Sequence, residues 1–284
     1  MIPAAFDYIR ATSLSHAIGL LQDDPDSNKL VAGGHSLIPA LKLRLASPER
    51  LIDIRNLPEL KGISLGDRIR IGALTTHAEL LASDALHEAA PIFRQAANLI
   101  ADPQVRNRGT IGGALANADP AADWPAVVLA LGATLDVVGP NGPSRVAARN
   151  FFVDIMTTAL APDEILLAVE FDRPQPGTRF RYRKIRHPAS GYAVVGVAVV
   201  LRPVDGAVAE ATIAITGATG HAFVAVDAAA QLIGKPLSEA TITTAADIAS
   251  GQAECLADNY APAAYRQHLI RTEVARALAS LDGD

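Results

Sequence analysis

The amino-acid sequence predicts an α+β fold built from three successive parts, of which the last is a small domain of antiparallel sheet plus helices. Strand and helix patterns alternate within about the first 55 residues, which indicates a β-α-β unit. A proline-rich break at residues 173–177 follows a longer middle part, and beyond it strand patterns precede helical patterns, as is typical of α+β domains. We therefore expect the parts to span residues 1–57, 58–175 and 176–284.

The first part contains a glycine turn between a strand and a helix. A helical pattern begins at Ser13, and a strand at residues 29–32 then runs directly into a glycine pair. Ser36 is a candidate N-cap for a helix that extends to about residue 45, and residues 50–54 form the next strand. The glycine turn is thus expected at the end of a strand and immediately before the first turn of a helix.

The second part is predicted to hold a hairpin, several helices and further strands. Alternation over residues 63–71 around Gly66 indicates the hairpin, and Thr75 and Thr76 are candidate caps for the helix that follows. Helical patterns also lie at residues 84–100 and 125–131, and strand patterns at residues 133–138 and 165–171. Residues 101–123 show no helix or strand pattern, and a loop of that length inside a domain is usually either functional or a wrong assignment.

The third part begins with strands and ends with helices. Strand patterns lie at residues 179–185, 192–201 and 209–216, and helical patterns lie at residues 223–233, 241–257 and 263–281. This order supports a small α+β domain at the end of the chain.

The composition excludes several classes of protein. Of the 284 residues, 50% are apolar and 19% are charged, which is sufficient for a sizeable core. A formal charge of −5 argues against a nucleic-acid partner, and the single cysteine, Cys255, excludes an internal disulfide or a cluster held by several thiolates. Residues 193–201, the longest apolar run, are too short to span a membrane, and residues 1–10 do not resemble a signal peptide. We expect a cytoplasmic protein whose redox chemistry comes from an organic cofactor or a partner.

Two glycine-rich loops carry the chemical signal. They comprise Ala32, Gly33, Gly34, His35 and Ser36 at the first turn, and Thr110, Ile111, Gly112, Gly113 and Ala114 within the long loop. Glycine lets a ligand approach the backbone closely, and amides at the start of a helix favour an anion such as phosphate. Either glycine pair alone is more simply a tight turn, but together the loops could hold the two phosphates of a dinucleotide. Neither loop matches the Rossmann or P-loop fingerprint, so both of those nucleotide-binding folds are disfavoured.

The order of these motifs resembles that of a known family. A-G-G-H-S-L follows a strand, and G-T-I-G-G with D-P-A-A-D comes about 75 residues later. This pattern is similar to the FAD-binding medium subunit of molybdenum hydroxylases, the family of aerobic carbon monoxide dehydrogenase and xanthine dehydrogenase flavoproteins. Residues 184–196 also resemble the C-terminal flavoprotein domain of that family. The resemblance covers essentially the whole chain and implies a two-part FAD-binding domain of the PCMH or vanillyl-alcohol-oxidase type, followed by the small C-terminal domain.

The resemblance also implies roles for individual residues. In the family both loops grip the FAD pyrophosphate mainly through backbone amides, so His35 is expected to contribute its backbone rather than its imidazole. Asp123 corresponds to a carboxylate near the sugar or ribityl hydroxyls, and Leu167 corresponds to backbone that lies along the flavin. Lys184 matches a lysine near the pyrimidine end of the flavin, where a cation stabilises negative charge on the reduced ring. Tyr192 matches an aromatic residue that packs over that ring.

Three of these side chains also have a plain structural alternative. Asp123 could cap the helix that follows it, because aspartate is a favoured N-cap. Lys184 could be a solvated lysine on a strand, and Tyr192 could belong to the core of its strand. The sequence leaves these alternatives open.

The resemblance implies the flavoprotein subunit of an oxidoreductase, without catalytic or metal-ligating side chains of its own. FAD on this chain would take electrons from [2Fe-2S] clusters on a small subunit and pass them to an external acceptor, while substrate is hydroxylated at molybdopterin on a large subunit. A peripheral position at the inner membrane face, through such a heterotrimeric complex, stays open. Two alternatives also stay open: a stand-alone FAD-dependent oxidoreductase of the vanillyl-alcohol-oxidase-like fold, and a non-catalytic nucleotide-binding module.

Overall fold

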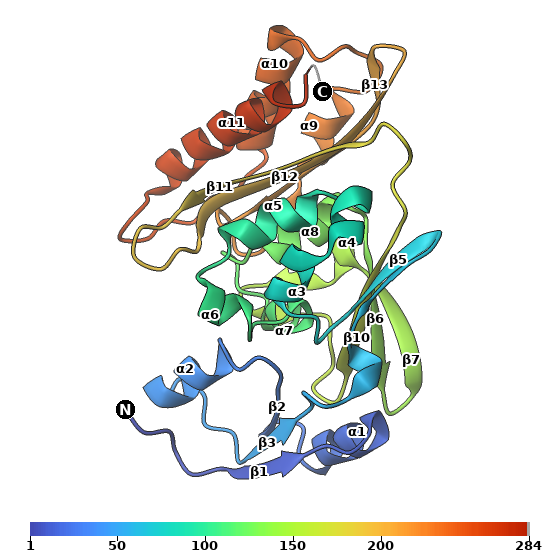
Figure 1. Cartoon of the computed structure of the whole chain (residues 1–284). Coiled ribbons are helices and arrows are strands. Elements are labelled where there is room, and N and C mark those ends of the chain that lie inside the picture. The colour runs from blue at the N-terminus through green and yellow to red at the C-terminus, as the bar shows by residue number, and fades with distance from the viewer. Residues whose placement is uncertain (283–284) are drawn as a thin grey trace.

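The computed structural model describes residues 1–282, and its three larger sheets lie one after another along the molecule (Figure 1). The first sheet is parallel, with the order β1-β3-β2, and consists of β1 (Asp7–Arg10), β2 (Asn28–Val31) and β3 (Arg50–Asp53). The connecting helices are α1 (Leu14–Asp23) and α2 (Leu37–Leu43). The predicted β-α-β unit is confirmed. The additional strand β1 escapes sequence analysis because its residues are mostly exposed and show no apolar pattern.

The second sheet is antiparallel and has the order β4-β5-β10-β6-β7. Its strands are β4 (Ile63–Leu65), β5 (Arg68–Gly72), β6 (Thr134–Gly139), β7 (Gly142–Ala147) and β10 (Ile165–Asp172), and a separate hairpin contains β8 (Phe152–Asp154) and β9 (Thr157–Thr158). Residues 139–142 turn the chain from β6 into β7. Most side chains of β7 are exposed or half-buried, so its sequence lacks a buried face.

The helices of the second part lie in the middle of the molecule (Figure 1). They are α3 (His77–Ala82), α4 (Asp84–Ala89), α5 (Ile92–Leu99), α6 (Pro103–Arg106), α7 (Ile111–Asn117) and α8 (Trp124–Ala130). The prediction of one helix over residues 84–100 is wrong, because Pro91 lacks a backbone N–H and restricts the conformation of Ala90 before it. The chain therefore breaks between α4 and α5.

The long segment from residue 101 to residue 123 contains two short helices, which the sequence does not predict. Asp102 caps α6 and Thr110 caps α7, each through a side-chain oxygen that accepts a backbone N–H three residues later. Glycines at positions 112 and 113 lower the intrinsic helix propensity of α7. The helices form here because their caps and their tertiary contacts outweigh that propensity.

The third sheet is antiparallel, with the order β11-β12-β13-β14. Its strands are β11 (Arg179–Arg186), β12 (Ala193–Val204), β13 (Ala207–Thr216) and β14 (Phe223–Val224), and its helices are α9 (Val226–Ala230), α10 (Glu239–Gly251) and α11 (Ala263–Ala279). Residues 223–233 begin as a strand, so the prediction of a helix from residue 223 is wrong. Helix α10 begins after its cap Ser238 and ends six residues before the predicted residue 257.

The third sheet is buried on both faces. One face forms an apolar core with α10 and α11, to which Val197 and Ile213 contribute. The other face places Phe180, Tyr182 and Ala198 in the same core as residues of α5 and α8. Because a sheet covered on both sides needs apolar residues at consecutive positions, residues 193–201 of β12 carry no polar side chain. This packing brings the third part against the second. No helix among residues 1–282 is long and apolar enough to cross a membrane.

Candidate FAD-binding site

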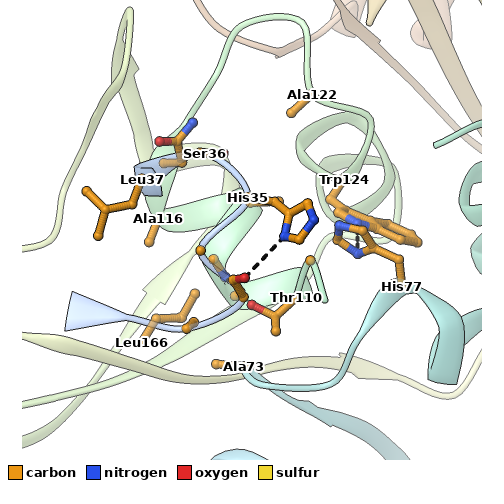
Figure 2. Close-up of a pocket in the computed structure, with 18 of the residues that line it drawn as sticks. His35, Ser36, Leu37, Ala73, His77, Thr110, Ala116, Ala122, Trp124 and Leu166 are labelled. Carbon is orange, nitrogen blue, oxygen red and sulfur yellow. Dashed lines mark hydrogen bonds between the residues drawn. The ribbon is translucent and has the colours of Figure 1, made fainter. Parts of the chain in front are cut away.

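A cavity of about 550 Å³ lies where the three parts of the chain meet (Figure 2). Its walls come from the loop between β2 and α2, from the turn after β5, from α7 and the start of α8, and from residues 190–192 before β12. Ligand pockets in proteins usually measure about 300–1,000 Å³. The cavity therefore has the size of a site for a small molecule or cofactor.

Most of the residues predicted to contact the cofactor line this cavity. They are Ala32, Gly33, Gly34, His35, Ser36, Thr110, Gly112, Gly113, Ala114, Asp123, Lys184 and Tyr192. Ile111 is instead fully buried in the core of the second part. Leu167 lies at an irregularity in the pairing of β10, where its carbonyl accepts the Ala73 N–H at 2.8 Å, and its neighbours Ile165 and Leu166 form the cavity wall.

The first loop presents a row of backbone donors to the cavity. Within residues 1–282, the N–H groups of residues 33–37 find no acceptor in the chain. Gly34 has a φ of +77°, in the left-handed region that glycine adopts readily, and the chain turns there into α2. The exposed ring of His35 places Nδ1 3.1 Å from the carbonyl oxygen of Gly33 (Figure 2). Free N–H groups before a helix favour an anionic ligand, which agrees with a role in binding pyrophosphate.

The second loop has fewer free donors than its sequence suggests. The N–H groups of Ile111 and Gly112 donate to the carbonyl oxygens of Thr75 and Ala73 at 3.0 and 2.9 Å. The N–H of Gly113 donates to the Thr110 hydroxyl at 3.1 Å. Among the described residues, the N–H of Thr110 has no acceptor. Contact between this loop and an anion is therefore expected through Thr110, while Gly113 offers an exposed surface without a side chain.

Two of the glycines bring segments of backbone together. A Cβ atom on Gly33 would lie 2.1 Å from the carbonyl oxygen of Arg108, which belongs to the chain just before the second loop. A Cβ atom on Gly112 would lie 2.4 Å from the Cβ of Ala73 in the turn after β5. These distances are far below van der Waals contact. Glycine is thus required at both positions for the loops to pack on one another, in addition to any approach by a ligand.

A buried ion pair joins the second and third parts beside the cavity. Asp123 accepts hydrogen bonds from the Lys184 ammonium at 2.8 Å and from the Tyr182 hydroxyl at 2.6 Å, and the ammonium also donates to the Leu99 carbonyl oxygen at 3.2 Å. The side chain of Lys184 is 1% exposed, so its alternative as a solvated lysine is wrong. Asp123 makes no capping bond to α8, so that alternative is also wrong. Burial raises the pKa of the Asp123 carboxyl, and the adjacent ammonium opposes this rise.

Tyr192 and Ser36 meet at the mouth of the cavity. Both residues line the cavity, so the first part and the third part of the chain approach one another here. The side chain of Tyr192 is 43% exposed and precedes β12, so the alternative as strand core is wrong. Ser36 makes no side-chain bond to the amides of α2, so the prediction that it caps this helix is also wrong.

His77 and Trp124 are cavity residues that sequence reasoning missed. His77 is the first residue of α3 and is 6% exposed, and its Nδ1 accepts the indole N–H of Trp124 at 3.1 Å. Burial, together with the nearby His35 and Arg106, lowers the pKa of His77 to about 4. One signal was available, because Thr76 and Glu79 form a capping box that fixes where α3 begins. The position of His77 beside the second loop depends on the backbone bridge between Thr76 and Thr110. The spacing of residues in the sequence cannot reveal such a bridge.

We expect acidification from pH 6.5 to 4 to destabilise the protein through His77. The imidazole gains a proton near pH 6.5 in the unfolded chain but only near pH 4 in the folded one, so the unfolded state binds more protons in this window. Stability therefore falls as the pH falls, by up to about 3 kcal/mol from this group. Urea unfolding at several pH values should show a smaller pH dependence for His77→Phe than for the unchanged protein. His268→Phe, which alters an exposed histidine on α11, is the control. Equal pH dependence of all three proteins would contradict the prediction.

The donors and charges around the cavity fit FAD. The N–H groups of residues 33–37 suit the pyrophosphate, and Lys184 supplies a buried cation that can interact with the electron-rich edge of a flavin. The aromatic ring of Tyr192 lies at the opening. A two-part N-terminal unit with this cavity, followed by a small α+β domain that closes it, defines an FAD-binding flavoprotein.

Comparisons with known proteins agree with this class. Residues 4–174 match the family described as the FAD binding domain in molybdopterin dehydrogenase, and residues 180–281 match the family described as the CO dehydrogenase flavoprotein C-terminal domain. The chain therefore belongs to the family of FAD-binding subunits of molybdopterin dehydrogenases, binds FAD, and is the flavoprotein subunit of an oxidoreductase.

Individual relatives resemble the chain over almost its whole length. The carbon monoxide dehydrogenase medium chain of Afipia carboxidovorans is 38% identical over 279 residues, which cover 98% of this chain and 97% of that one. The nicotine 6-hydroxylase medium subunit of Paenarthrobacter nicotinovorans is 35% identical over 275 residues, covering 96% of each chain. Among solved structures, carbon monoxide dehydrogenase from Hydrogenophaga pseudoflava superposes with a TM-score of 0.96 and 39% identity, covering 99% of this chain and 98% of that one. Quinoline 2-oxidoreductase from Pseudomonas putida 86 superposes with a TM-score of 0.93 and 33% identity, covering 99% of this chain and 98% of that one.

Proposed function

We propose that this chain is the electron-transferring FAD subunit of a three-component molybdenum hydroxylase. It takes electrons from [2Fe-2S] clusters of a small subunit and passes them to an external acceptor, while a large molybdopterin subunit hydroxylates the substrate. The observation that most supports this proposal is the similarity to a carbon monoxide dehydrogenase medium chain over 98% of this chain and 97% of that chain. A medium chain of that kind works beside a larger and a smaller one, and a cytoplasmic location suits such a complex.

The residues around the cavity have distinct tasks in this proposal. When bound, FAD supplies the chemistry of accepting and releasing electrons. The amides of residues 33–37 hold the pyrophosphate, and the ammonium of Lys184, fixed by Asp123, favours negative charge on the reduced ring. Tyr192 covers the opening and limits the access of water. The described cavity needs no proton-abstracting side chain for these tasks.

The proposal is tested by electron transfer from an iron–sulfur protein. The FAD-loaded chain is mixed anaerobically with the pre-reduced small [2Fe-2S] subunit that copurifies with it, and the absorbance of oxidised flavin is followed. Stoichiometric bleaching, followed by recovery when an acceptor is added, is the expected result. A chain that copurifies with no iron–sulfur protein and oxidises an organic substrate unaided would instead be a stand-alone oxidoreductase. Flavin that cannot be reduced by any donor would indicate a non-catalytic nucleotide-binding module.

We expect the FAD to be held without a covalent bond. The single cysteine, Cys255, does not line the cavity, and His77 uses one ring nitrogen to accept from Trp124. After denaturation and ultrafiltration, the yellow colour should therefore pass through the membrane, and its mass should be that of FAD. Flavin retained on the polypeptide would contradict the non-covalent attachment, and release of FMN would contradict the role of the loops in binding pyrophosphate.

A further inference from the structure

His77 and Trp124 form a buried donor–acceptor pair in the wall of the cavity. The indole nitrogen of Trp124 donates to Nδ1 of His77 at 3.1 Å, and the centroids of the two rings are 5.7 Å apart (Figure 2). Because an indole nitrogen can donate but not accept, Nδ1 of His77 must be the acceptor and carries no proton. A neutral His77 therefore carries its proton on Nε2.

The Nε2–H group of His77 lacks an acceptor within residues 1–282. The hydrogen bond with Trp124 occupies the other ring nitrogen, and no second bond of the imidazole occurs in the described structure. The side chain is 6% exposed and lines the cavity, so bulk water has little access to it. Nε2 itself is not completely enclosed, so this nitrogen is open to the cavity. A hydrogen-bond donor that has no protein acceptor and faces a ligand cavity is available to an acceptor atom of the ligand.

The position of Nε2 indicates which portion of the ligand it meets. A Cβ atom on Gly109 would lie 2.7 Å from Nε2, so this nitrogen lies directly beside the start of the second loop. The next residue, Thr110, has a backbone N–H that finds no acceptor in the described chain. The imidazole of His35 on the first loop is close enough to influence His77 electrostatically. Donors from three segments thus gather where the two loops approach one another.

We propose that the Nε2–H group of His77 donates a hydrogen bond to a pyrophosphate oxygen of FAD, and that Trp124 is a positioning residue that holds the required tautomer. This inference rests on FAD binding and not on the proposed transfer of electrons. Burial and the neighbouring charges of Arg106 and His35 disfavour a doubly protonated imidazole. His77 therefore acts as a neutral donor whose state does not change near neutral pH, unlike an exposed histidine.

The tautomer can be observed directly in the unmodified protein. Chemical shifts of ¹⁵N in labelled histidine rings distinguish protonated from unprotonated nitrogens, and His77→Gln assigns the signal. We expect Nε2 to be protonated and Nδ1 to be unprotonated at pH 7 in the apoprotein. Addition of FAD, or of ADP as a probe with a pyrophosphate and no flavin, should shift the Nε2–H resonance downfield. A proton on Nδ1, or a resonance that neither probe moves, would overturn the proposal even where variants fail to fold.

Affinity measurements separate the donor from the residue that positions it. His77→Phe removes the donor and keeps an aromatic ring, and should weaken binding of both FAD and ADP about 10- to 100-fold. His77→Gln can still accept from Trp124 and donate to the ligand, and should recover much of the affinity. Trp124→Phe should leave the imidazole with mixed tautomers in the ¹⁵N spectrum and cause a smaller loss. His268→Phe, on the exposed face of α11, should bind as the unchanged protein does.

Failure of the His77 hydrogen bond can be distinguished from failure of the proposed electron-transfer function. Equal affinity of His77→Phe and the unchanged protein for FAD and ADP refutes the hydrogen bond. If binding is lost in His77→Phe and restored in His77→Gln, the hydrogen bond is supported whether or not an iron–sulfur protein can reduce the bound flavin. The proposed electron-transfer function can therefore fail without affecting this result.

Discussion

Replacing Lys184 with methionine is expected to destabilise the folded protein by about 3–5 kcal/mol, because this change breaks a buried ion pair by removing one partner. The carboxylate of Asp123 keeps the Tyr182 hydroxyl but loses its ammonium at 2.8 Å. The pKa of Asp123, already raised by burial, should rise further, so that the carboxyl takes up a proton more readily. Urea unfolding of the apoprotein at neutral pH measures the loss of stability.

The same change should lower the midpoint potential of the bound flavin by tens of millivolts. The wall of the cavity loses the positive charge that favours the anionic reduced ring, and the shift is largest while Asp123 stays ionised. Two unit charges about 4 Å apart interact by about 1–4 kcal/mol at high to intermediate effective dielectric. For a two-electron couple, 1.4 kcal/mol corresponds to about 30 mV, so the expected shift is tens of millivolts. A spectroelectrochemical titration of the two flavinylated proteins measures the shift.

Matched variants distinguish the two effects of Lys184. Lys184→Met combined with Asp123→Asn removes both charges, keeps an amide oxygen that can accept from the Tyr182 hydroxyl, and should recover much of the lost stability. The potential should stay low in this double variant because the cation is still absent. Asp123→Asn alone leaves the ammonium without its counter-charge and should raise the potential. If Lys184→Met unfolds as the unchanged protein does, the ion pair is not a stabilising contact of the folded state.

Gly33→Val is expected to abolish FAD binding and to destabilise the protein at the same time. The new Cβ would lie 2.1 Å from a carbonyl oxygen of Arg108, and backbone cannot move aside as a flexible side chain can. Overpacking of this kind costs about 1–3 kcal/mol, and the loops must separate to relieve it. Separation moves the amides of residues 33–37 away from Thr110, so at least a 100-fold loss of FAD affinity should follow, given that about 1.4 kcal/mol is tenfold.

The control for Gly33 is Gly19 in α1, where a Cβ atom would meet nothing within 4 Å. Gly19→Val should leave FAD affinity unchanged and alter stability only through helix propensity. Affinity is measured by fluorescence titration of the apoprotein, and stability by urea unfolding. If the affinity of Gly33→Val for FAD were within tenfold of that of the unchanged protein, FAD binding would not require the two loops to approach as closely as they do here.

Local patterns predicted the architecture better than they predicted the site. The β-α-β unit and the strands of the third part were predictable because their apolar residues recur with the period of the element. Helix α7 was not predictable, because its stability comes from Thr110 and from backbone contacts to the turn after β5, which outweigh two glycines. Most of the residues that the motifs and the resemblance indicated do line the cavity, but the motifs could not show how many amides of the second loop are already bonded.

The residues that sequence analysis missed depend on long-range packing. Tyr182 reaches Asp123 across 59 positions of the chain, and Trp124 reaches His77 across 47. Neither pair has a spacing that a linear pattern could show. For Lys184, the resemblance implied a position at the cofactor and the residue lines the cavity, but a lysine on a strand gives no sign that its ammonium is buried. Only the packing of the third sheet against α8 removes water from that charge.

The ion pair at the boundary between the second and third parts limits how these parts can be exchanged. The anion belongs to the residue immediately before α8, while the ammonium and the phenol that satisfy it belong to β11. A chimera that joins residues 1–175 to the last domain of another flavoprotein would bury an unmatched carboxylate unless the donor domain supplies a lysine and a hydroxyl at the same two places. Domains should therefore be exchangeable only between family members that have a lysine at the position of Lys184 and a hydroxyl residue at the position of Tyr182.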